Sequence, residues 1–293
     1  MMKYMQFIKM HGLGNDFVIV DLLTKKQNIF KDLGKAAVSV CERNFGIGAD
    51  GLVFILPSDK ADIKMRIFNS DGSEAEMCGN VIRCVARYVY DMNIMKNNRI
   101  SVETLAGIMV PEIIFDDKNK AVVRVNMGKP ILDPAKVPVK ITENDLDGIV
   151  NEKLKVDERE FSITCVSMGN PHCVIFVSDL EIEEVVDWGP KIETHAVFPK
   201  KTNVEFVKIL NGNEVKMQVW ERGAGLTLAC GTGACAAAVA AVLNGLTNKK
   251  VQVHLSVGSL LVEWASDGNV YMTGPAEYVY FGELHEEFLQ NIT

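Results

Sequence analysis

The sequence lacks any long apolar run that could cross a bilayer. Its nearest candidate, Leu228–Gly245, is mostly alanine and glycine and is better suited to a packed interior. No basic stripe is present either, and the formal net charge of -7 argues against a nucleic-acid surface. The first residues contain no long apolar core followed by a cleavage site, as a secretory signal would. We therefore expect a soluble cytoplasmic protein with no nucleic-acid and no membrane partner.

Metal and cofactor motifs are also absent. The chain has seven cysteines and five histidines, but no Cys-x-x-Cys pair and no two histidines at the spacing of zinc ligands. The glycine-rich stretch Gly46–Gly51 lacks the third glycine of a dinucleotide-binding loop. The odd cysteine count and the lack of a small-domain disulfide spacing favour reduced thiols. The sequence thus predicts no metal, no disulfide framework and no cofactor.

What the sequence does contain is many short strand patterns and few helices. Runs rich in Val, Ile, Phe and Thr alternate with turn residues, and Asn211-Gly212 and Asp267-Gly268 each sit between two such runs, which indicates hairpins. Helical patterns cover three segments, and a fourth, weaker surface helix is expected at 144–154. The three stronger helices are expected at 33–45, 78–93 and 230–244.

An internal repeat organises these elements. The stretch Gly12–Asp21 resembles Ser167–Asp179: each has Gly-Asn, two further residues and an apolar strand. Each is followed, at nearly the same distance, by a Cys-Gly step at the start of a helix. Nine positions before each of these cysteines a polar residue closes a strand. These polar residues are Asn69, before Cys78, and Glu221, before Cys230.

The repeat predicts an α/β (α+β) protein of two similar domains, each a mostly antiparallel sheet or half-barrel around a central buried helix. The active site is expected in the cleft between them. The helix after Cys230 is apolar on every face, which is typical of a buried helix. The helix after Cys78 carries Arg83 and Arg87, so part of one side is expected to be exposed. The domains are expected at 1–124, joined by 277–293, and at 125–276.

A cysteine at a helix start is placed for acid–base chemistry. The unpaired N–H groups and the dipole of the helix attract an anion, and they lower the pKa of a thiol toward neutrality. Gly79 and Gly231 leave the backbone accessible to a carboxylate, and Asn80 and Thr232 add donors. Two such thiols on opposite sides of one ligand could invert a stereocentre next to a carboxylate. One sulfur would remove the proton and the other would deliver one.

At these residues the chain closely resembles the diaminopimelate epimerase family. The matching motifs run in the family's order over nearly the whole chain. They are "HGLGNDFVIVD", "GIGADGLV", "RIFNSDGSEAEMCGN", "SMGNPHCV", "TNVEF", "ERGAG", "ACGTGACA" and "GPAEYVYFGEL". The resemblance implies a cofactor-independent isomerase that interconverts LL- and meso-diaminopimelate with two cysteines, in lysine and peptidoglycan precursor biosynthesis.

The resemblance also implies roles for individual residues. Cys78 and Cys230 would be the acid/base thiols, with His172 as the partner of Cys78 and Glu221 as the partner of Cys230. Arg222 is suited to a bidentate grip on the distal carboxylate. The substrate-binding residues would be Asn15, Asn69, Gly79, Asn80, Asn170, Asn203, Glu221, Arg222, Gly231 and Thr232.

The chain departs from the family pattern at Val81, where changed packing rather than lost chemistry is expected, and at Leu226. No ligand role is assigned to Gly51. Three alternatives remain beside this reading: a two-thiol racemase acting on proline or hydroxyproline, a thiol–disulfide redox protein, and a binding module without catalysis. Exposed strand faces are compatible with a homodimer, and the expected partner is the small-molecule substrate, diaminopimelate.

Overall fold

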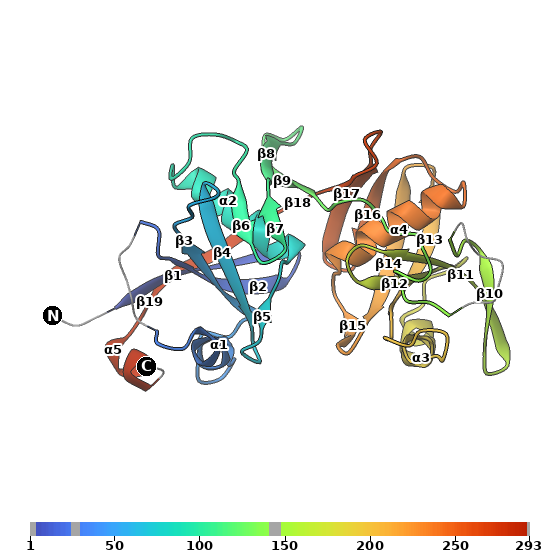
Figure 1. The fold of residues 1–293 in the computed structure, drawn as a ribbon, viewed down its shortest axis with the longest axis horizontal. Helices are drawn as coiled ribbons and strands as arrows, with labels where there is room; N and C mark the ends of the chain where they lie inside the picture. The colour runs from blue at the N-terminus through green and yellow to red at the C-terminus, as the bar shows by residue number, and fades with distance from the viewer. Residues whose placement is uncertain (1–3, 25–29, 141–147, 292–293) are drawn as a thin grey trace. The chain divides into compact units, whose positions relative to one another are not determined.

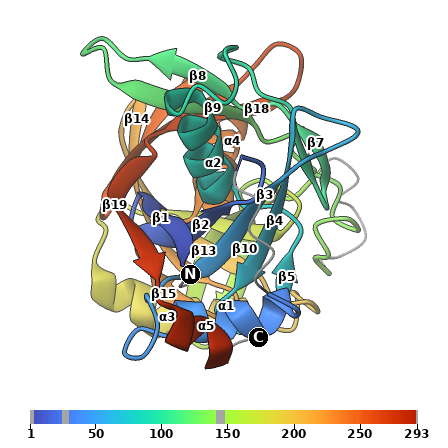
Figure 2. The ribbon, with the colours of Figure 1, turned by 90° about the vertical axis from the view of Figure 1, so that its left-hand side faces the viewer.

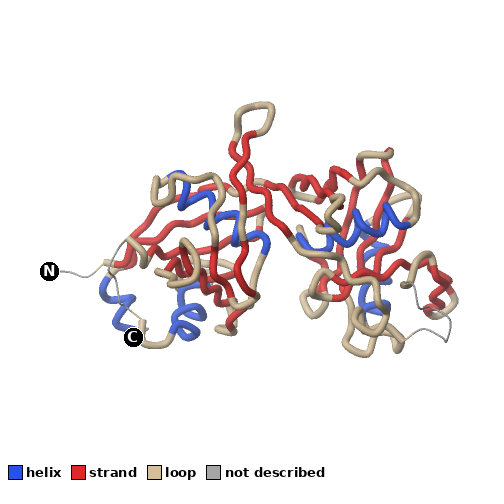
Figure 3. The backbone as a smooth tube through the Cα atoms, turned by 45° about the horizontal axis from the view of Figure 1, so that its top comes forward, coloured by secondary structure: helices blue, strands red, loops and turns tan. Residues whose placement is uncertain are grey.

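The computed structural model describes residues 4–24, 30–140 and 148–291 of the chain. The chain divides into two compact units: unit 1 comprises Met1–Val125 with Gly274–Thr293, and unit 2 comprises Asn126–Thr273 (Figure 1). Strands far outnumber helices in both units (Figure 3). Among the described residues, none of the helices combines the length and apolar character that crossing a bilayer requires.

Unit 1 is built on one large sheet. Its strands are β1 (Met5–Gly12), β2 (Asn15–Asp21), β3 (Gly51–Leu56), β4 (Ile63–Asn69), β5 (Glu74–Ala75), β6 (Val102–Thr104), β7 (Gly107–Met109), β8 (Glu112–Phe115), β9 (Ala121–Asn126) and β19 (Glu277–Leu284). The sheet runs in the order β19-β1-β2-β3-β4-β6-β7, with β5 paired to β4, whereas β8 and β9 pair with each other outside this sheet and belong to the other one. The helices of this unit are α1 (Leu33–Cys41), α2 (Gly79–Asp91) and α5 (Glu286–Asn291).

Unit 2 repeats this plan. Its strands are β10 (Glu152–Val156), β11 (Arg159–Ser167), β12 (Pro171–Phe176), β13 (Asn203–Asn211), β14 (Glu214–Glu221), β15 (Gly225–Thr227), β16 (Lys250–Leu255), β17 (Gly258–Trp264) and β18 (Val270–Gly274). They run in the order β10-β11-β12-β13-β14-β16-β17-β18, and β15 pairs with β14. Its helices are α3 (Ile182–Glu193) and α4 (Gly231–Leu243).

The two sheets share one pairing pattern. From β1 to β7 the successive pairs are antiparallel, parallel, antiparallel, parallel and antiparallel, and the same series runs from β11 to β17. Helix α1 follows the second strand of its series as α3 does, and α2 follows the fourth as α4 does. The predicted repeat and the fold class of two similar α/β domains are therefore confirmed.

Each sheet carries a helix on each face. Successive side chains along a strand point to opposite faces, so each strand contributes residues to both helix contacts. In unit 1 the side chains of Val18 and Phe54 pack with α1 in one core cluster, while α2 packs over the other face (Figure 2). In unit 2 a second cluster joins Cys173 and Phe206 to α3. The opposite face of that sheet carries α4, which packs against β11 to β14, β16 and β17.

The two long helices differ in how they are buried. Helix α4 is apolar all round and its residues from Gly233 to Ala241 are buried, as predicted. Helix α2 is polar in part, yet Arg83 is 0% exposed, so the expected exposed side at this arginine was wrong. Its guanidinium donates to the carbonyl oxygens of Pro275 and Gly79 and to Asn80 Oδ1, which satisfies the buried charge. Val81, two residues before Arg83, is also fully buried.

Several predicted elements need correction. The helix expected at 33–45 ends at Cys41. The weak helix expected at 144–154 lies partly outside the described residues, and its end is wrong because Glu152–Val156 forms β10. Helix α3 was not predicted, because its Gly189-Pro190 step resembles a helix end. Both hairpins predicted from Asn-Gly and Asp-Gly are confirmed as β13–β14 and β17–β18.

Candidate active site

In unit 1 the polar groups gather at the start of α2. Cys78 is the N-cap residue, with extended backbone angles, and its side chain is half-buried. Its Sγ atom lies 4.0 Å from Asn15 Oδ1, and Asn80 Nδ2 donates to the same oxygen at 3.0 Å. The turn between β1 and β2 and the first turn of α2 thus meet at the amide of Asn15.

A charged cluster fixes the orientation of Asn15. Asn15 Nδ2 donates to Asp50 Oδ2 at 2.7 Å, and Arg43 donates to Asp50 Oδ1 at 2.9 Å. The buried ammonium group of Lys9 lies 2.6 Å from Asp16. Burial alone would raise the pKa of Asp16, but its contacts with Lys9 and Arg43 outweigh burial and lower it. Asp16 therefore stays ionised, and the hydrogen bond from Asn15 Nδ2 to Asp50 leaves Asn15 Oδ1 facing the helix.

The other predicted residues of unit 1 lie close by in the sequence but make separate contacts. Asn69 ends β4, is exposed, and donates to Ser73 Oγ at 3.0 Å. Gly79 is the first residue of α2, and its carbonyl oxygen accepts from Arg83. The structure therefore brings Asn15, Cys78 and Asn80 into contact, whereas Asn69 is hydrogen-bonded to Ser73 instead.

In unit 2 the equivalent helix start is more enclosed. Cys230 is the N-cap residue of α4, and only 6% of it is exposed. The backbone N–H of Gly233 donates to Cys230 Sγ at 3.4 Å, and Thr232 Oγ1 lies 3.5 Å from the same sulfur. Gly231 is the first helical residue. The sulfur therefore takes the place of the oxygen that caps an ordinary helix.

The pKa of Cys230 departs from the sequence prediction. A helix N-terminus was expected to lower it, but the pKa of this thiol is raised well above its ordinary value. Burial is the largest cause, and the carboxylates of Glu221 and Glu205, when ionised, add to it. The hydrogen bonds from Thr232 and Gly233 act in the opposite direction but are outweighed. The thiol form of Cys230 is favoured in this structure.

His172 forms a buried pair with a residue that the sequence analysis did not assign. Its Nδ1 atom lies 2.6 Å from Glu205 Oε1, and both side chains are fully buried. The parallel register pairs His172 with Asn203 and Val174 with Glu205, so alternation places His172 and Glu205 on the face that carries α4. Glu205 lies inside the motif "TNVEF", and this spacing is the signal that could have identified it.

His172 Nε2 lies 3.0 Å from Asn170 Oδ1, and Asn170 Nδ2 donates to Thr232 Oγ1 at 3.3 Å. Both ring nitrogens of His172 therefore have partners within unit 2. The expected pairing of His172 with Cys78 stays a prediction.

The remaining predicted residues of unit 2 cluster where β13 and β14 meet. Asn203 Nδ2 donates to the carbonyl oxygen of Pro171 at 2.7 Å, and Asn203 Oδ1 accepts from the backbone N–H of Arg222 at 3.0 Å. Glu221 accepts a hydrogen bond from the hydroxyl of Thr227. The guanidinium of Arg222 is exposed and donates to the carbonyl oxygen of Lys200 at 3.2 Å, so its proposed role with a substrate carboxylate stays a prediction.

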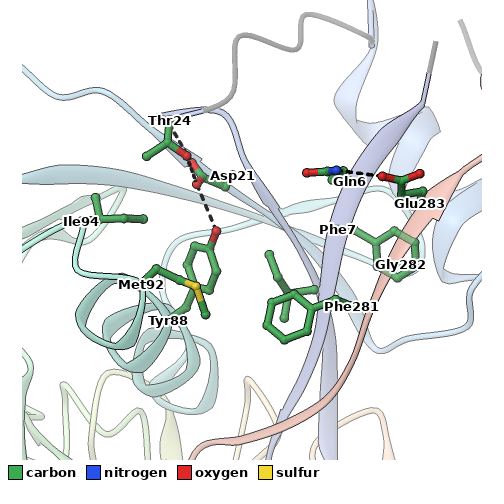
Figure 4. Close-up of a pocket in the computed structure, with 11 residues that line it drawn as sticks. Gln6, Phe7, Asp21, Thr24, Tyr88, Met92, Ile94, Phe281, Gly282 and Glu283 are labelled. Atoms are coloured by element: carbon green, nitrogen blue, oxygen red, sulfur yellow. Dashed lines mark hydrogen bonds between the residues drawn. The ribbon is translucent and has the colours of Figure 1, made fainter. Parts of the chain in front are cut away.

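The other sulfurs and the described pockets lie apart from these clusters. All seven cysteines fall within the described residues and none forms a disulfide; besides Cys230, the buried ones are Cys41, Cys84, Cys165, Cys173 and Cys235. Within the described ranges, no three of the His, Cys, Asp and Glu side chains gather so that they could hold a metal ion. A pocket of about 690 Å³ in unit 1 contains none of the predicted site residues, and its Asp21 accepts from Tyr88 and Thr24 (Figure 4).

Comparisons with known proteins identify relatives of this chain. A family model described as diaminopimelate epimerase matches residues 7–132 and 164–279. The diaminopimelate epimerase of Desulfitobacterium hafniense is 55% identical over 285 residues, which cover 97% of this chain and 100% of that protein. The diaminopimelate epimerase of Pelotomaculum thermopropionicum is 54% identical over 279 residues, covering 95% of this chain and 98% of that protein.

Solved structures share the fold at low sequence identity. A Bacillus anthracis phenazine biosynthesis protein of the PhzF family matches with a TM-score of 0.68 and 16% identity, covering 96% of this chain and 99% of that one. A hydroxyproline epimerase from Agrobacterium vitis, with bound trans-4-OH-L-proline, matches with a TM-score of 0.65 and 14% identity, covering 96% and 92%. These two show the fold alone. The family model and the two relatives, more than half identical over nearly the whole chain, show that this chain belongs to the diaminopimelate epimerase family.

Proposed function

We propose that this protein interconverts LL- and meso-diaminopimelate by moving a proton at the α-carbon, with Cys78 and Cys230 as the two acid/base groups and without a cofactor. The observation that carries the proposal is the duplication itself. In a chain of this family, a cysteine is the N-cap residue of the equivalent helix in each of two units with the same strand pairing.

The reaction balances with two sulfurs and no other reagent. One thiolate takes the α-proton and becomes a thiol, and the electron pair of the C–H bond passes into the carboxylate as an enolate. The other thiol then gives its proton to the opposite face of the carbon and becomes a thiolate. Backbone N–H groups at a helix N-terminus stabilise the charge that develops on the carboxylate. The pair shares one proton throughout, so its two steps of titration belong to both sulfurs together.

The electrostatics of unit 2 support Cys230 as the group that starts as the acid in one direction of the reaction. Burial and the neighbouring carboxylates raise the pKa of its thiol, so the proton is held until the substrate carbon accepts it. We assign Glu221 as the group that influences this proton, because its charge contributes to that raised pKa. His172 is assigned to Cys78, a role that would require its Nε2 atom to exchange the present contact with Asn170.

The proposed substrate-binding groups divide by chemistry. Gly79, Asn80, Gly231 and Thr232 at the two helix starts would bind the reacting carboxylate. The groups for the other ends of the substrate carry amide, carboxylate or guanidinium functions, which match ammonium and carboxylate groups. They are Asn15, Asn69, Asn170, Asn203, Glu221 and Arg222.

The test is incubation of the dialysed protein with LL-diaminopimelate, with a chelator present and no cofactor added, while meso product is followed by chiral chromatography. The proposal expects meso product from the wild type and none from the Cys78→Ala or Cys230→Ala variant. L-Proline and trans-4-hydroxy-L-proline serve as competing substrates. Turnover of either of these in preference to diaminopimelate, or a requirement for an added cofactor, would contradict the proposal.

A further inference from the structure

The two units differ in the residues at two equivalent buried positions on neighbouring strands. In unit 1, Phe17 lies two residues after Asn15 on β2 and pairs with Gly51 on β3. Val53, two residues after Gly51, lies on the same face of the sheet, the one that carries α2. In unit 2 the same places hold His172 and Glu205, because His172 follows Asn170 by two residues and pairs with Asn203. The apolar pair Phe17 and Val53 is buried without polar partners being needed. A fold of this plan therefore does not require the histidine and the glutamate.

The polar pair is costly where it lies. His172 and Glu205 are each 0% exposed. Glu205 Oε1 contacts His172, but Oε2 is buried and has no hydrogen-bond partner among the described residues. An ionised carboxylate with one oxygen left unpaired in the interior carries a large desolvation cost. Burial accordingly raises the pKa of Glu205, although the nearby imidazole acts against the shift.

The contacts of His172 define where its protons lie. The amide nitrogen of Asn170 donates to Thr232, so its oxygen, Oδ1, is the atom that faces His172 Nε2. An oxygen of an amide only accepts, and Nε2 must therefore carry a hydrogen. One further proton lies between Nδ1 and Glu205 Oε1, on either atom. The pair then has no net charge and presents Nε2–H as a donor.

From this donor a chain of hydrogen bonds leads to the sulfur of Cys230. Nε2–H of His172 donates to Asn170, the amide of Asn170 donates to the Thr232 hydroxyl at 3.3 Å, and that hydroxyl is left to donate to Cys230 Sγ, 3.5 Å away. Each step has the same direction, from the buried pair to the sulfur. The start of α4 lies directly on Glu205, because a Cβ atom at Gly233 would be 2.8 Å from Glu205 Oε1.

We infer that Glu205 is a positioning residue: its buried carboxyl group holds the imidazole of His172 with Nε2 as a donor, and through Asn170 and Thr232 this directs a hydroxyl hydrogen onto the sulfur of Cys230. The inference rests on the proposed function for its consequence in catalysis, since it is the Cys230 thiolate, formed after proton delivery, that the Thr232 hydroxyl stabilises.

The first test reads the proton positions directly. Nitrogen-15 NMR of protein labelled at histidine distinguishes the two neutral tautomers from imidazolium, and a His172→Gln variant assigns the signal. The wild type is expected to show a protonated Nε2. Glu205→Gln, which can still bond to Nδ1, is expected to keep that state, and Glu205→Leu to lose it. Glu214 is the matched control, since it pairs with the partly exposed His254, and Glu214→Leu should leave His172 unchanged. A wild-type His172 with hydrogen only on Nδ1 would overturn the inference.

The second test reads the sulfur. The rate of alkylation of Cys230 by iodoacetamide is followed against pH by mass spectrometry of its peptide, in a Cys78→Ala background. Thr232→Val and Glu205→Leu are both expected to raise the pH midpoint of alkylation by at least half a unit, which lowers the rate at a fixed pH about threefold. Thr232→Ser and Glu205→Gln should keep the midpoint of the Cys78→Ala protein. Glu214→Leu is expected to have no effect.

Two results of this second test would overturn the inference. One is a lowered midpoint in Glu205→Leu, which would mean that Glu205 acts on Cys230 as a bare negative charge. The other is an unchanged midpoint in Glu205→Leu, which would mean that Glu205 does not act on the sulfur of Cys230 through Asn170 and Thr232. Neither readout uses diaminopimelate, so a wild type without epimerase activity would contradict the proposed function and leave these measurements to decide the inference separately.

Discussion

The two units bring the same parts together and orient them in opposite ways. In unit 1 the amide of Asn15 turns its oxygen toward the helix start, where Asn80 donates to it and Cys78 Sγ lies near it. In unit 2 the amide of Asn170 turns its nitrogen toward the helix start and donates to Thr232. The first arrangement accepts a hydrogen from the helix side, and the second supplies one. One pattern of strand pairing therefore supports two unlike environments for sulfur.

The difference originates in what lies behind each asparagine. Behind Asn15 is Asp50, which accepts from the amide nitrogen and is itself paired with Arg43. Behind Asn170 is the buried pair of His172 and Glu205, which contacts the amide oxygen. The duplicated scaffold therefore sets where the thiols lie, whereas the residues behind the asparagines set which atom of the amide faces each helix start.

The largest expected effect tests whether both cysteines are needed. Cys78→Ala and Cys230→Ala should each reduce kcat for epimerisation by about 1000-fold or more, because each removes the proton carrier of one face. Cys84→Ala and Cys235→Ala are the controls, since these sulfurs are buried in the same two helices. They should keep near wild-type kcat. Substantial turnover in Cys78→Ala or Cys230→Ala would contradict the two-thiol account, because the cysteine of one unit would then be enough for epimerisation.

The next effect separates stability from function by giving unit 2 the residues of unit 1. The double variant His172→Phe with Glu205→Val should lose epimerisation by about 100-fold or more, because both the proposed partner of Cys78 and the donor chain to Cys230 are removed. Its Tm at neutral pH should equal or exceed that of the wild type, since apolar replacement of a buried polar pair is often neutral or stabilising. Activity and thermal unfolding are measured on the same samples. A retained kcat would show that the pair is not functional.

The same double variant should also change how stability depends on pH. Burial raises the folded-state pKa of Glu205, so its contribution to the free energy of unfolding is full below the ordinary glutamate pKa and is lost as the pH rises through the folded value. The double variant should lack this loss. Single Glu205→Val should instead lower Tm, because it leaves His172 Nδ1 buried without a partner. Denaturant titrations at a series of pH values, from below the ordinary glutamate pKa upward, measure the free energy of unfolding of the wild type and the variants.

A smaller effect is expected from adding one methyl group at the start of α4. In Gly233→Ala the new Cβ atom would lie 2.8 Å from Glu205 Oε1 and 3.3 Å from Cys230 Sγ, so one of them must move. We expect kcat to fall about tenfold to a hundredfold, because small displacements of reacting groups are costly in rate. Gly212→Ala, whose added Cβ would meet only Asn248 at 3.6 Å, is the control and should be silent. Unchanged kinetics in Gly233→Ala would argue that this contact is not needed.

The smallest effect concerns substrate binding at Arg222. Arg222→Ala should raise KM about tenfold with a smaller change in kcat, because a charge-assisted hydrogen bond to a carboxylate contributes about 1.5–3 kcal/mol. Arg159, which pairs with Glu184 on the surface of unit 2, supplies the control Arg159→Ala. Equal KM values for wild type and Arg222→Ala would remove this residue from the site.

Much of this architecture could be predicted from the sequence because its signals are local. The Asn211-Gly212 turn, the Cys-Gly helix starts and the apolar α4 each follow from a few neighbouring residues. Helix α3 could not be predicted in this way, since contact with Trp220 rather than local pattern accommodates Gly189 before Pro190. Arg83 was misplaced for the same reason, because one of its acceptors is the carbonyl oxygen of Pro275, far along the chain.

The candidate site was predictable in its residue types but not in its electrostatics. The helix N-terminus correctly placed Cys230 as a cap, yet the sign of its pKa shift depends on burial and on Glu205 and Glu221, which lie on other strands. Glu205 reaches the site only through the parallel register of β12 and β13. A residue whose role depends on strand register is invisible until the pairing is known.

The most direct test of the two-sulfur account is the isotope content at early conversion of LL-diaminopimelate in heavy water. With separate acid and base thiols, the proton removed from one face is not the one delivered to the other, so the first meso product should carry deuterium at the inverted α-carbon. The remaining LL substrate should carry little. Early meso product that keeps the original hydrogen would mean that a single group moves it from one face to the other, and would contradict the account.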